Sequence, residues 1–274
     1  MDQGFISCKD HTHDVMAVST QLVLSAITVT VAFLLVAFVY QKRKINASAL
    51  VGTLGLGVLI LLLLGLTYGY IGLLTLLTFF FFGNLVTRYK YEKKFKLGVA
   101  EAHRGMRDIQ NVLGNGLSPL IFALLFAVSS EHLELLFLLG FSGAVATATA
   151  DTFSTEIGQA DGTPRLITTL KHVPVGTNGG VSLPGFVAAA LGAGLIAVVS
   201  LLFLGSRAVT YIGAVFFIIC LLAGFSGCLI DSFLGATVED RNPLRLNKHH
   251  VNILSTLSGG LIAMLLGSSL SMHL

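Results

Sequence analysis

The chain has 274 residues, of which 54% are hydrophobic and only 11% are charged, and its mean hydropathy is +0.84. A soluble domain carries about 25% charged residues, so most of this chain must lie in a bilayer rather than in water. The net charge of +3 gives no support to a nucleic-acid partner. The composition predicts an all-α, polytopic bundle of transmembrane helices.

Eight apolar stretches are long enough to be candidate spans, since a spanning helix needs about 20 apolar residues. They lie at 18–40, 47–65, 67–87, 112–129, 133–150, 181–204, 209–232 and 251–271. The fourth and fifth stretches are short, so a re-entrant pair is an alternative to two full crossings. Residues 1–17 are polar and are predicted to form a tail, which leaves 18–274 as a single transmembrane domain.

The loops between these spans differ sharply in charge. The loops at 41–46, 88–111, 151–180 and 238–250 carry 15 of the 17 Lys and Arg residues. The positive-inside rule makes this side cytoplasmic and places both termini outside. The opposite loops are short, so we expect a functional site on the cytoplasmic side. The predicted location is an integral, multi-pass membrane position, in the plasma membrane if the cell is prokaryotic.

A polar segment with two carboxylates follows directly on the fifth span. Asp151 shares a helix face with Ser154 and Thr155, whereas Glu156 points elsewhere unless the helix ends there. Carboxylate oxygens suit Mg²⁺ held between the protein and substrate phosphates. An interfacial helix end is the alternative, but acids at membrane depth are costly and usually functional, which favours a site.

A glycine-rich loop precedes the sixth span. It consists of Gly176, Thr177, Asn178, Gly179 and Gly180, with Ser182 two residues further on. Backbone amides in such a loop, next to a helix N-terminus, are suited to binding a phosphate. A plain flexible turn is the alternative. The cations Arg165 and Lys171 lie between this loop and the carboxylates, and the loop lacks the Gly-Lys-Ser/Thr of a Walker A motif.

Two further polar stretches lie in the cytoplasmic loops. One contains Arg107, Gln110 and Asn115, where arginine suits phosphate, although a solvated or headgroup-binding basic loop is the alternative. The other places Asp231 and Gly235 on one helix face at the end of the seventh span, with Asn252 following the next loop. Both stretches add candidate binding groups to the same side.

The pairs of spans 5–6 and 7–8 suggest an internal repeat. Phe141-Ser142-Gly143 precedes Asp151, and Phe225-Ser226-Gly227 precedes Asp231. Both units run in the same direction, so a parallel repeat would place the two aspartates at equivalent depth. The spacers differ in length, and the repeat stays a hypothesis.

The motifs at 111–116, 151–158, 176–182 and 227–236 resemble a family of integral membrane proteins long known as a domain of unknown function. That family includes the phytyl-phosphate kinases of vitamin E synthesis and the animal transmembrane protein nineteen. The resemblance covers nearly the whole chain from the first span onward. At position 114 the family pattern is expected to have a small residue such as Ala before the Asn-Gly pair. This chain has Gly114 there, which is a mild departure from that pattern.

The resemblance implies an enzyme whose catalytic domain is residues 18–274. It would transfer a phosphoryl group from a nucleoside triphosphate, CTP or ATP, to a phytyl, geranylgeranyl or polyprenyl monophosphate. Carried over by position, Asp151, Glu156, Asn178 and Asp231 would be the central polar residues. Mg²⁺ on Asp151 and Glu156 or Asp231, with Arg107, Arg165 and Lys171 on phosphate oxygens, would stabilise the transition state. The lipid tail would lie between spans in the membrane.

Three alternatives stay open at this point. A CTP-dependent lipid-phosphate cytidylyltransferase would use the same substrates and release pyrophosphate. A secondary transporter of an anionic or lipid substrate would place its acids nearer the bilayer centre. A scaffold without catalytic activity does not explain why acids and glycines gather on one face. The sequence is compatible with an oligomer.

Overall fold

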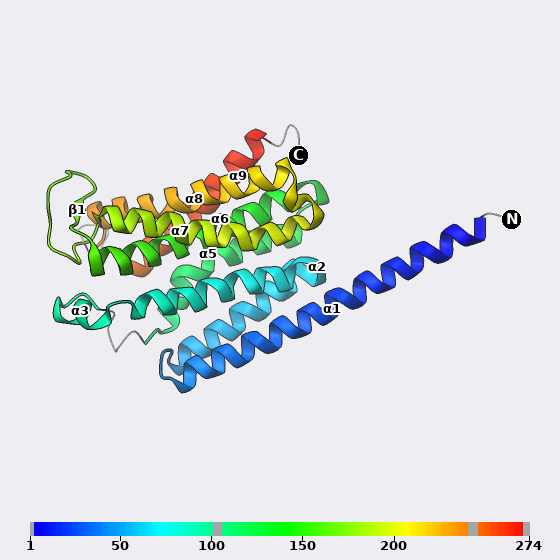
Figure 1. Cartoon of the computed structure of the whole chain (residues 1–274), viewed down its shortest axis with the longest axis horizontal. Helices are drawn as coiled ribbons and strands as arrows, with labels where there is room; N and C mark the ends of the chain where they lie inside the picture. Colours follow the sequence, from blue (N-terminus) through cyan, green and yellow to red (C-terminus); the bar gives the residue numbers. More distant parts are fainter. Residues whose placement is uncertain (1–2, 101–105, 241–245, 271–274) are drawn as a thin grey trace.

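The computed structural model describes residues 3–100, 106–240 and 246–270, and it is a bundle of long helices that run side by side (Figure 1). Within that part of the chain, seven helices are long and apolar enough to cross a membrane. The all-α transmembrane fold class is therefore confirmed. The short helix α3 (Tyr91–Lys96), the 3-10 helix η1 (Leu201–Val209) and a two-stranded ribbon lie between them.

Helix α1 spans Gln3–Gln41, so the segment predicted as a polar tail is helical from residue 3 onward. Its apolar part, Ser19–Gln41, corresponds to the first predicted span. Residues 1 and 2 of that predicted tail, like residue 271 of the predicted eighth span, lie outside the described residues.

Helix α2 (Ala47–Arg88) folds back on itself at Gly65, where φ is +67° and ψ is −172°. A Cβ built on Gly57 would lie 3.3 Å from Leu73, which is 16 residues away and would be about 24 Å away along a straight helix. Gly69 likewise lies against the backbone of Leu61. The two halves of α2 are therefore antiparallel and correspond to the second and third predicted spans, which makes eight crossings from seven long helices.

The remaining long helices match the predicted spans in order, with shifted ends. They are α5 (Ile109–Val128), α6 (Glu131–Asp161), α7 (Leu183–Ser200), α8 (Tyr211–Thr237) and α9 (Lys248–Leu270). Helix α5 is about 30 Å long and α6 about 46 Å, long enough for full crossings rather than a re-entrant pair. The fifth prediction ended α6 eleven residues too early, because the polar residues after Ala150 continue the helix to Asp161.

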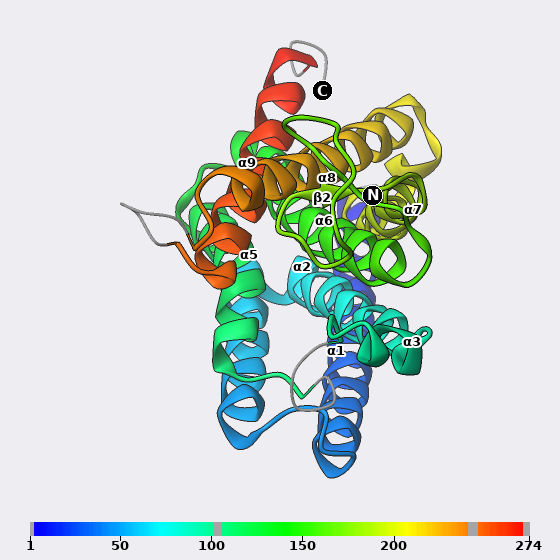
Figure 2. The ribbon, with the colours of Figure 1, turned by 90° about the vertical axis from the view of Figure 1, so that its left-hand side faces the viewer.

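The described parts of the four basic loops lie at one end of the bundle, on the left in Figure 1 and facing the viewer in Figure 2. The loop between α1 and α2 pairs with the segment before α5 through two backbone bonds, Arg107 N–H to Lys44 at 2.9 Å and Asn46 N–H to Arg107 at 3.1 Å. The loop after α6 forms the ribbon of β1 (Arg165–Leu166) and β2 (Gly180–Val181), which are antiparallel with Arg165 opposite Val181.

Helices α6 to α9 form the compact part of the bundle, whereas α1 and the first half of α2 lie to one side (Figure 2). Helix α6 is the central helix, since all residues from Leu138 to Ala150 are buried. Small residues let its neighbours approach closely, as is usual in membranes. A Cβ on Gly143 would lie 2.7 Å from Ala263 of α9, and one on Gly224 of α8 would lie 2.7 Å from Ala146.

Candidate functional site

Asp151 of α6 and Asp231 of α8 line one cavity of about 160 Å³ at the basic end of the bundle. We call this cavity the carboxylate pocket. The two side chains make a hydrogen bond to each other, and Ser255 of α9 donates from Oγ to Asp231 Oδ1 at 2.8 Å. Two carboxylates so close repel each other unless a proton or a cation lies between them. The geometry therefore favours a cation or a proton at this position.

The carboxylate pocket brings together residues that are up to 101 positions apart in the chain. Twelve predicted site residues line it: Asp151, Ser154, Thr155, Gly176, Thr177, Asn178, Gly179, Gly180, Ser182, Asp231, Gly235 and Asn252. They come from α6, the glycine-rich loop, α8 and α9. The pocket thus gathers the two aspartates, the glycine-rich loop and the start of α7 around one space.

The glycine-rich loop lies directly against the last turns of α8. Gly179 has φ +76°, and a Cβ there would clash with Ala236 and lie 2.6 Å from the carbonyl oxygen of Ser232. Gly235 faces it, because a Cβ on Gly235 would lie 3.1 Å from the amide nitrogen of Gly179. Only glycine permits both this backbone conformation and this close approach. The loop is therefore held beside Asp231 rather than extended into solvent.

The N-terminus of α7 is built against α6. Ser182 caps α7, because its Oγ accepts a hydrogen bond from the amide of Gly185 at 3.3 Å. A Cβ on Gly158 of α6 would lie 3.1 Å from this same Oγ, and one on Gly185 would lie 3.1 Å from Ser154 Oγ. The positive end of the α7 dipole therefore faces the carboxylate pocket close to the glycine amides, where an anion is favoured.

Two charged residues of the pocket were missed by the sequence reasoning. Glu239 follows α8 and Lys248 begins α9, and both line the carboxylate pocket. Burial raises the pKa of Glu239, and Asp240 and Asp151 raise it further, whereas Lys248 opposes the shift. No local motif marks either residue, since Glu239 lies at the pocket because of where α8 ends and Lys248 because of where α9 begins.

Glu156 does not join the two aspartates. It is 5% exposed and forms a salt bridge with Lys94 of α3, which is 1% exposed. Lys94 Nζ also donates to the carbonyl oxygen of Thr87 at 2.9 Å. Because α6 continues past Asp151, a residue five positions later points to another side of the helix. The structure therefore places Glu156 in a buried ion pair and outside the proposed metal site.

Helix α3 and the two residues before it bind the end of α6. Tyr89 Oη donates to Asp161 at 2.9 Å, Lys90 Nζ pairs with Asp161 at 2.5 Å, and Lys93 Nζ donates to the carbonyl oxygen of Ala160 at 2.5 Å. The hydrogen bond that Lys90 donates to Asp161 raises the pKa of Lys90. These contacts and the Lys94–Glu156 pair hold α3 on the end of α6. We call this set of contacts the α3 clamp.

Arg165 and Lys171 lie outside the carboxylate pocket. Arg165 Nη1 donates to the carbonyl oxygen of Leu170 at 2.9 Å, and Lys171 is exposed in the same loop. Neither side chain lines the pocket, so their contact with phosphate oxygens stays a prediction. Among the described residues, Lys248 is the Lys or Arg that lines the pocket.

The stretch at the start of α5 also lies apart from the glycine-rich loop. Gln110 is exposed in the first turn of α5, which is capped by Asp108. Arg107 and Asn115 line a second cavity, between α1, α2 and α5. Asn115 connects the two cavities, because its Oδ1 accepts a hydrogen bond at 3.4 Å from Asn252 Nδ2, and Asn252 lines the carboxylate pocket.

The carboxylate pocket offers two carboxylates, which fits Mg²⁺ only if water and substrate phosphates supply its other ligands. Across the described residues, no three His, Cys, Asp or Glu side chains form a group able to hold a metal ion by themselves. Mg²⁺ is usually held by only one or two protein carboxylates, with water and substrate phosphates completing its shell. Asp151 and Asp231 supply two such carboxylates beside a loop suited to phosphate.

Comparisons with known proteins extend over most of the chain. The model of the integral membrane protein family DUF92 matches residues 30–260. An uncharacterized membrane protein of Methanocaldococcus jannaschii is 34% identical over 254 residues, covering 92% of this chain and 97% of that protein. An uncharacterized membrane protein of Synechocystis is 34% identical, covering 88% of this chain and 89% of its own length.

A plant relative is also similar. The chloroplastic protein VTE6 of Arabidopsis thaliana is 35% identical over 203 residues, which are 73% of this chain and 59% of that protein. No solved structure matches the chain. With a family model that matches more than half of its length and relatives above 30% identity, the chain belongs to the DUF92 family of integral membrane proteins.

Proposed function

We propose that the protein is a prenyl-phosphate kinase. It transfers a phosphoryl group from a nucleoside triphosphate, with CTP as the preferred donor, to a prenyl monophosphate and yields the prenyl diphosphate. The observation that carries this proposal is the pairing of Asp151 and Asp231 beside a glycine-rich loop and a helix N-terminus in one pocket. The family resemblance to phytyl-phosphate kinases supports the same reaction.

The reaction requires no covalent intermediate with a protein side chain. An oxygen of the acceptor phosphate, already ionised, forms the new bond to the γ-phosphorus, and the bond to the bridging oxygen breaks as the nucleoside diphosphate leaves. No general base is required, and the barrier comes mainly from bringing anions together. The loop amides, the N-terminus of α7 and Lys248 lie where they stabilise this charge.

Asp151 and Asp231 would hold Mg²⁺, which neutralises phosphate charge when it is bound. Asn178 and Thr177 offer polar groups from the loop to the nucleotide. We place this site on the cytoplasmic side, because the basic loops gather at that end; the membrane would be the plasma membrane if the cell is prokaryotic.

The test is a product analysis with the purified protein in lipid nanodiscs. CTP or ATP, Mg²⁺ and geranylgeranyl or phytyl phosphate are supplied, and the products are separated by chromatography. The expected products are the nucleoside diphosphate and the prenyl diphosphate, with loss of both on chelation of Mg²⁺. Pyrophosphate release would instead identify a cytidylyltransferase, and uptake of prenyl phosphate into vesicles without nucleotide turnover would identify a transporter.

Gly179→Ala is expected to weaken nucleotide binding strongly, and Gly98→Ala is its matched control. Both glycines have a positive φ, +76° and +72°, so each variant carries a similar backbone cost of about 1–2 kcal/mol. Only at Gly179 would the new methyl group clash with α8, whereas nothing lies within 4 Å at Gly98. We expect the Kd for CTP, measured by isothermal titration, to rise roughly 10-fold or more only in Gly179→Ala. Equal affinities in the two variants would contradict this role for the loop.

A further inference from the structure

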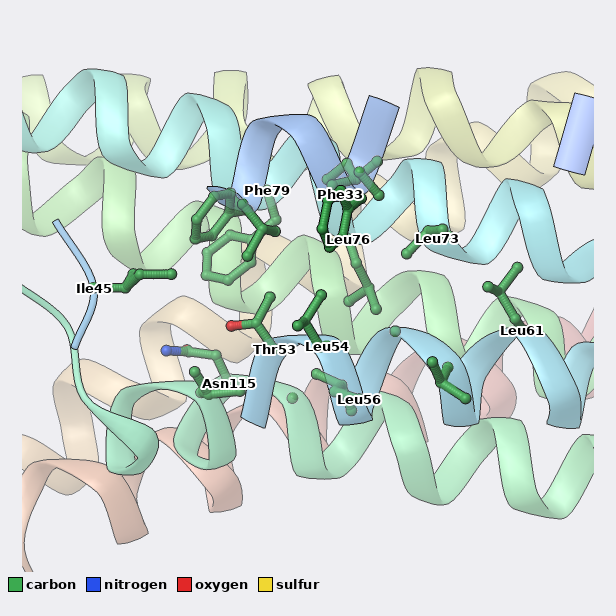
Figure 3. A pocket seen from close by; sticks show the side chains of 18 of the residues that line it. Phe33, Ile45, Thr53, Leu54, Leu56, Leu61, Leu73, Leu76, Phe79 and Asn115 are labelled. Atoms are coloured by element: carbon green, nitrogen blue, oxygen red, sulfur yellow. The ribbon is translucent and has the colours of Figure 1, made fainter. Parts of the chain in front are cut away.

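An apolar cavity of about 240 Å³ lies between α1, both halves of α2 and the start of α5. We call it the α1–α2–α5 groove. Figure 3 shows Leu76 and Phe79 of the second half of α2 pointing toward Thr53 and Leu54 of the first half, with Phe33 of α1 at the side. Nearly all of its lining is hydrocarbon, which suits an alkyl or isoprenoid chain.

The groove has one polar end, formed by Arg107, Asn111 and Asn115. The Arg107 guanidinium lies 5.9 Å from the ring centre of Phe79, and the Arg107 backbone is held by hydrogen bonds to Lys44 and Asn46. A cation at the end of an apolar groove suits a ligand with an anionic head and a hydrocarbon chain.

The polar end of the groove is linked to the carboxylate pocket by one hydrogen bond. Asn115 lines the groove and accepts the hydrogen bond from Asn252, which lines the pocket. Arg107 also lies near α6, because Arg107 Nη2 and Thr152 Cγ2 both lie within 4 Å of the position that a Cβ of Gly83 would occupy. The polar end of the groove therefore adjoins the carboxylate pocket through Asn115 and Asn252.

We propose that the α1–α2–α5 groove binds the hydrocarbon chain of a single-chain lipid monophosphate, with the phosphate at Arg107 and Asn115. This inference rests on the proposed function only for the identity of the lipid as the phosphoryl acceptor. The lined part of α2 from Thr53 to Leu61 is about 12 Å long, less than half of the roughly 30 Å hydrocarbon core. The groove holds the first part of the chain, and the rest extends into the bilayer.

Photocrosslinking tests the location without requiring turnover. A geranylgeranyl monophosphate that carries a diazirine near its head is irradiated with the intact protein in nanodiscs, and the labelled peptides are identified by mass spectrometry. We expect labels on the groove segments of α1 and α2, lost in the presence of excess geranylgeranyl phosphate. Labels confined to other surfaces, or labels that only a two-chain phosphatidic acid displaces, would overturn the proposal.

Two variants test the two ends of the groove. Thr53→Trp fills its apolar part, and Leu62→Trp, on the same helix but 73% exposed and outside the groove, is the matched control. We expect Thr53→Trp to weaken binding of geranylgeranyl phosphate roughly 10-fold, with an unchanged Kd for CTP. Arg107→Gln is expected to raise the Kd for geranylgeranyl phosphate roughly 10- to 100-fold. It is expected to leave binding of the neutral alcohol geranylgeraniol unchanged.

The outcomes separate this inference from the proposed function. If the wild type transfers the phosphoryl group but Thr53→Trp and Leu62→Trp bind the lipid equally well, the groove is not the lipid site. The kinase proposal would still stand. Groove labelling and a selective effect of Arg107→Gln, in a protein that yields no prenyl diphosphate, would support a lipid-phosphate site and overturn the kinase proposal.

Discussion

Replacement of Asp151 or Asp231 by asparagine is expected to lower kcat for prenyl diphosphate formation about 100- to 1,000-fold. The two carboxyl groups make a hydrogen bond to each other in the carboxylate pocket, and they are the two acids of the proposed Mg²⁺ site. An amide keeps the shape and removes the charge that binds a hard cation. The rate of nucleoside diphosphate release measures the effect.

Asp161→Asn is the matched control for this pair. Asp161 is also an acid of α6, but it pairs with Lys90 at the α3 clamp and lies outside the carboxylate pocket. Its replacement is expected to change kcat by less than about threefold, since a partly exposed ion pair contributes little. If Asp151→Asn releases nucleoside diphosphate at the wild-type rate, the proposed chemistry at this pocket is wrong.

Replacement of Lys94 by methionine, or of Glu156 by glutamine, is expected to destabilise the fold by about 3–5 kcal/mol. Each substitution leaves the partner charge buried and unpaired, because both side chains are almost inaccessible. Unfolding in a graded SDS titration, followed by circular dichroism, measures the loss. The double variant Lys94→Met with Glu156→Leu removes both charges and is expected to recover much of the stability.

Glu92→Gln is the control for this experiment, since Glu92 is an exposed acid of the same α3 helix. The Glu156 variants also separate two roles. A Glu156→Gln protein with wild-type stability and a large loss of kcat would show that this carboxyl acts in the chemistry, as the family resemblance implies. A loss of stability that the double variant reverses supports the α3 clamp.

The α3 clamp lies close to the residues that line the carboxylate pocket. It binds α3 to the last turns of α6, just beyond Ser154 and Thr155, which line the carboxylate pocket. The segment after α3 also approaches the glycine-rich loop, because a Cβ on Gly176 would clash with Val99. The basic residues of α3 therefore contribute to the position of the loop, in addition to any attraction to anionic lipid.

The sequence by itself determined the membrane environment, the order of the spans and the end of the bundle that carries the polar residues. These features follow from local composition, because the bilayer requires long apolar helices and basic loops lie on one side. It also marked Asp151 and Asp231 as candidate site residues, since acids at the ends of apolar spans are costly and usually functional. The boundary between the second and third predicted spans, at 65–67, follows from the length of the apolar stretches, and the structure turns there at Gly65.

Only the tertiary structure decided which polar groups meet. Glu156 and Asp151 are near in sequence, yet the continued helix α6 turns Glu156 toward Lys94 and Asp151 toward Asp231. Lys248 lines the pocket, whereas Arg165 and Lys171 do not. The physical reason is that a side chain's partners depend on helix rotation and on close packing through small residues, which involve distant parts of the chain and leave no mark in the local sequence.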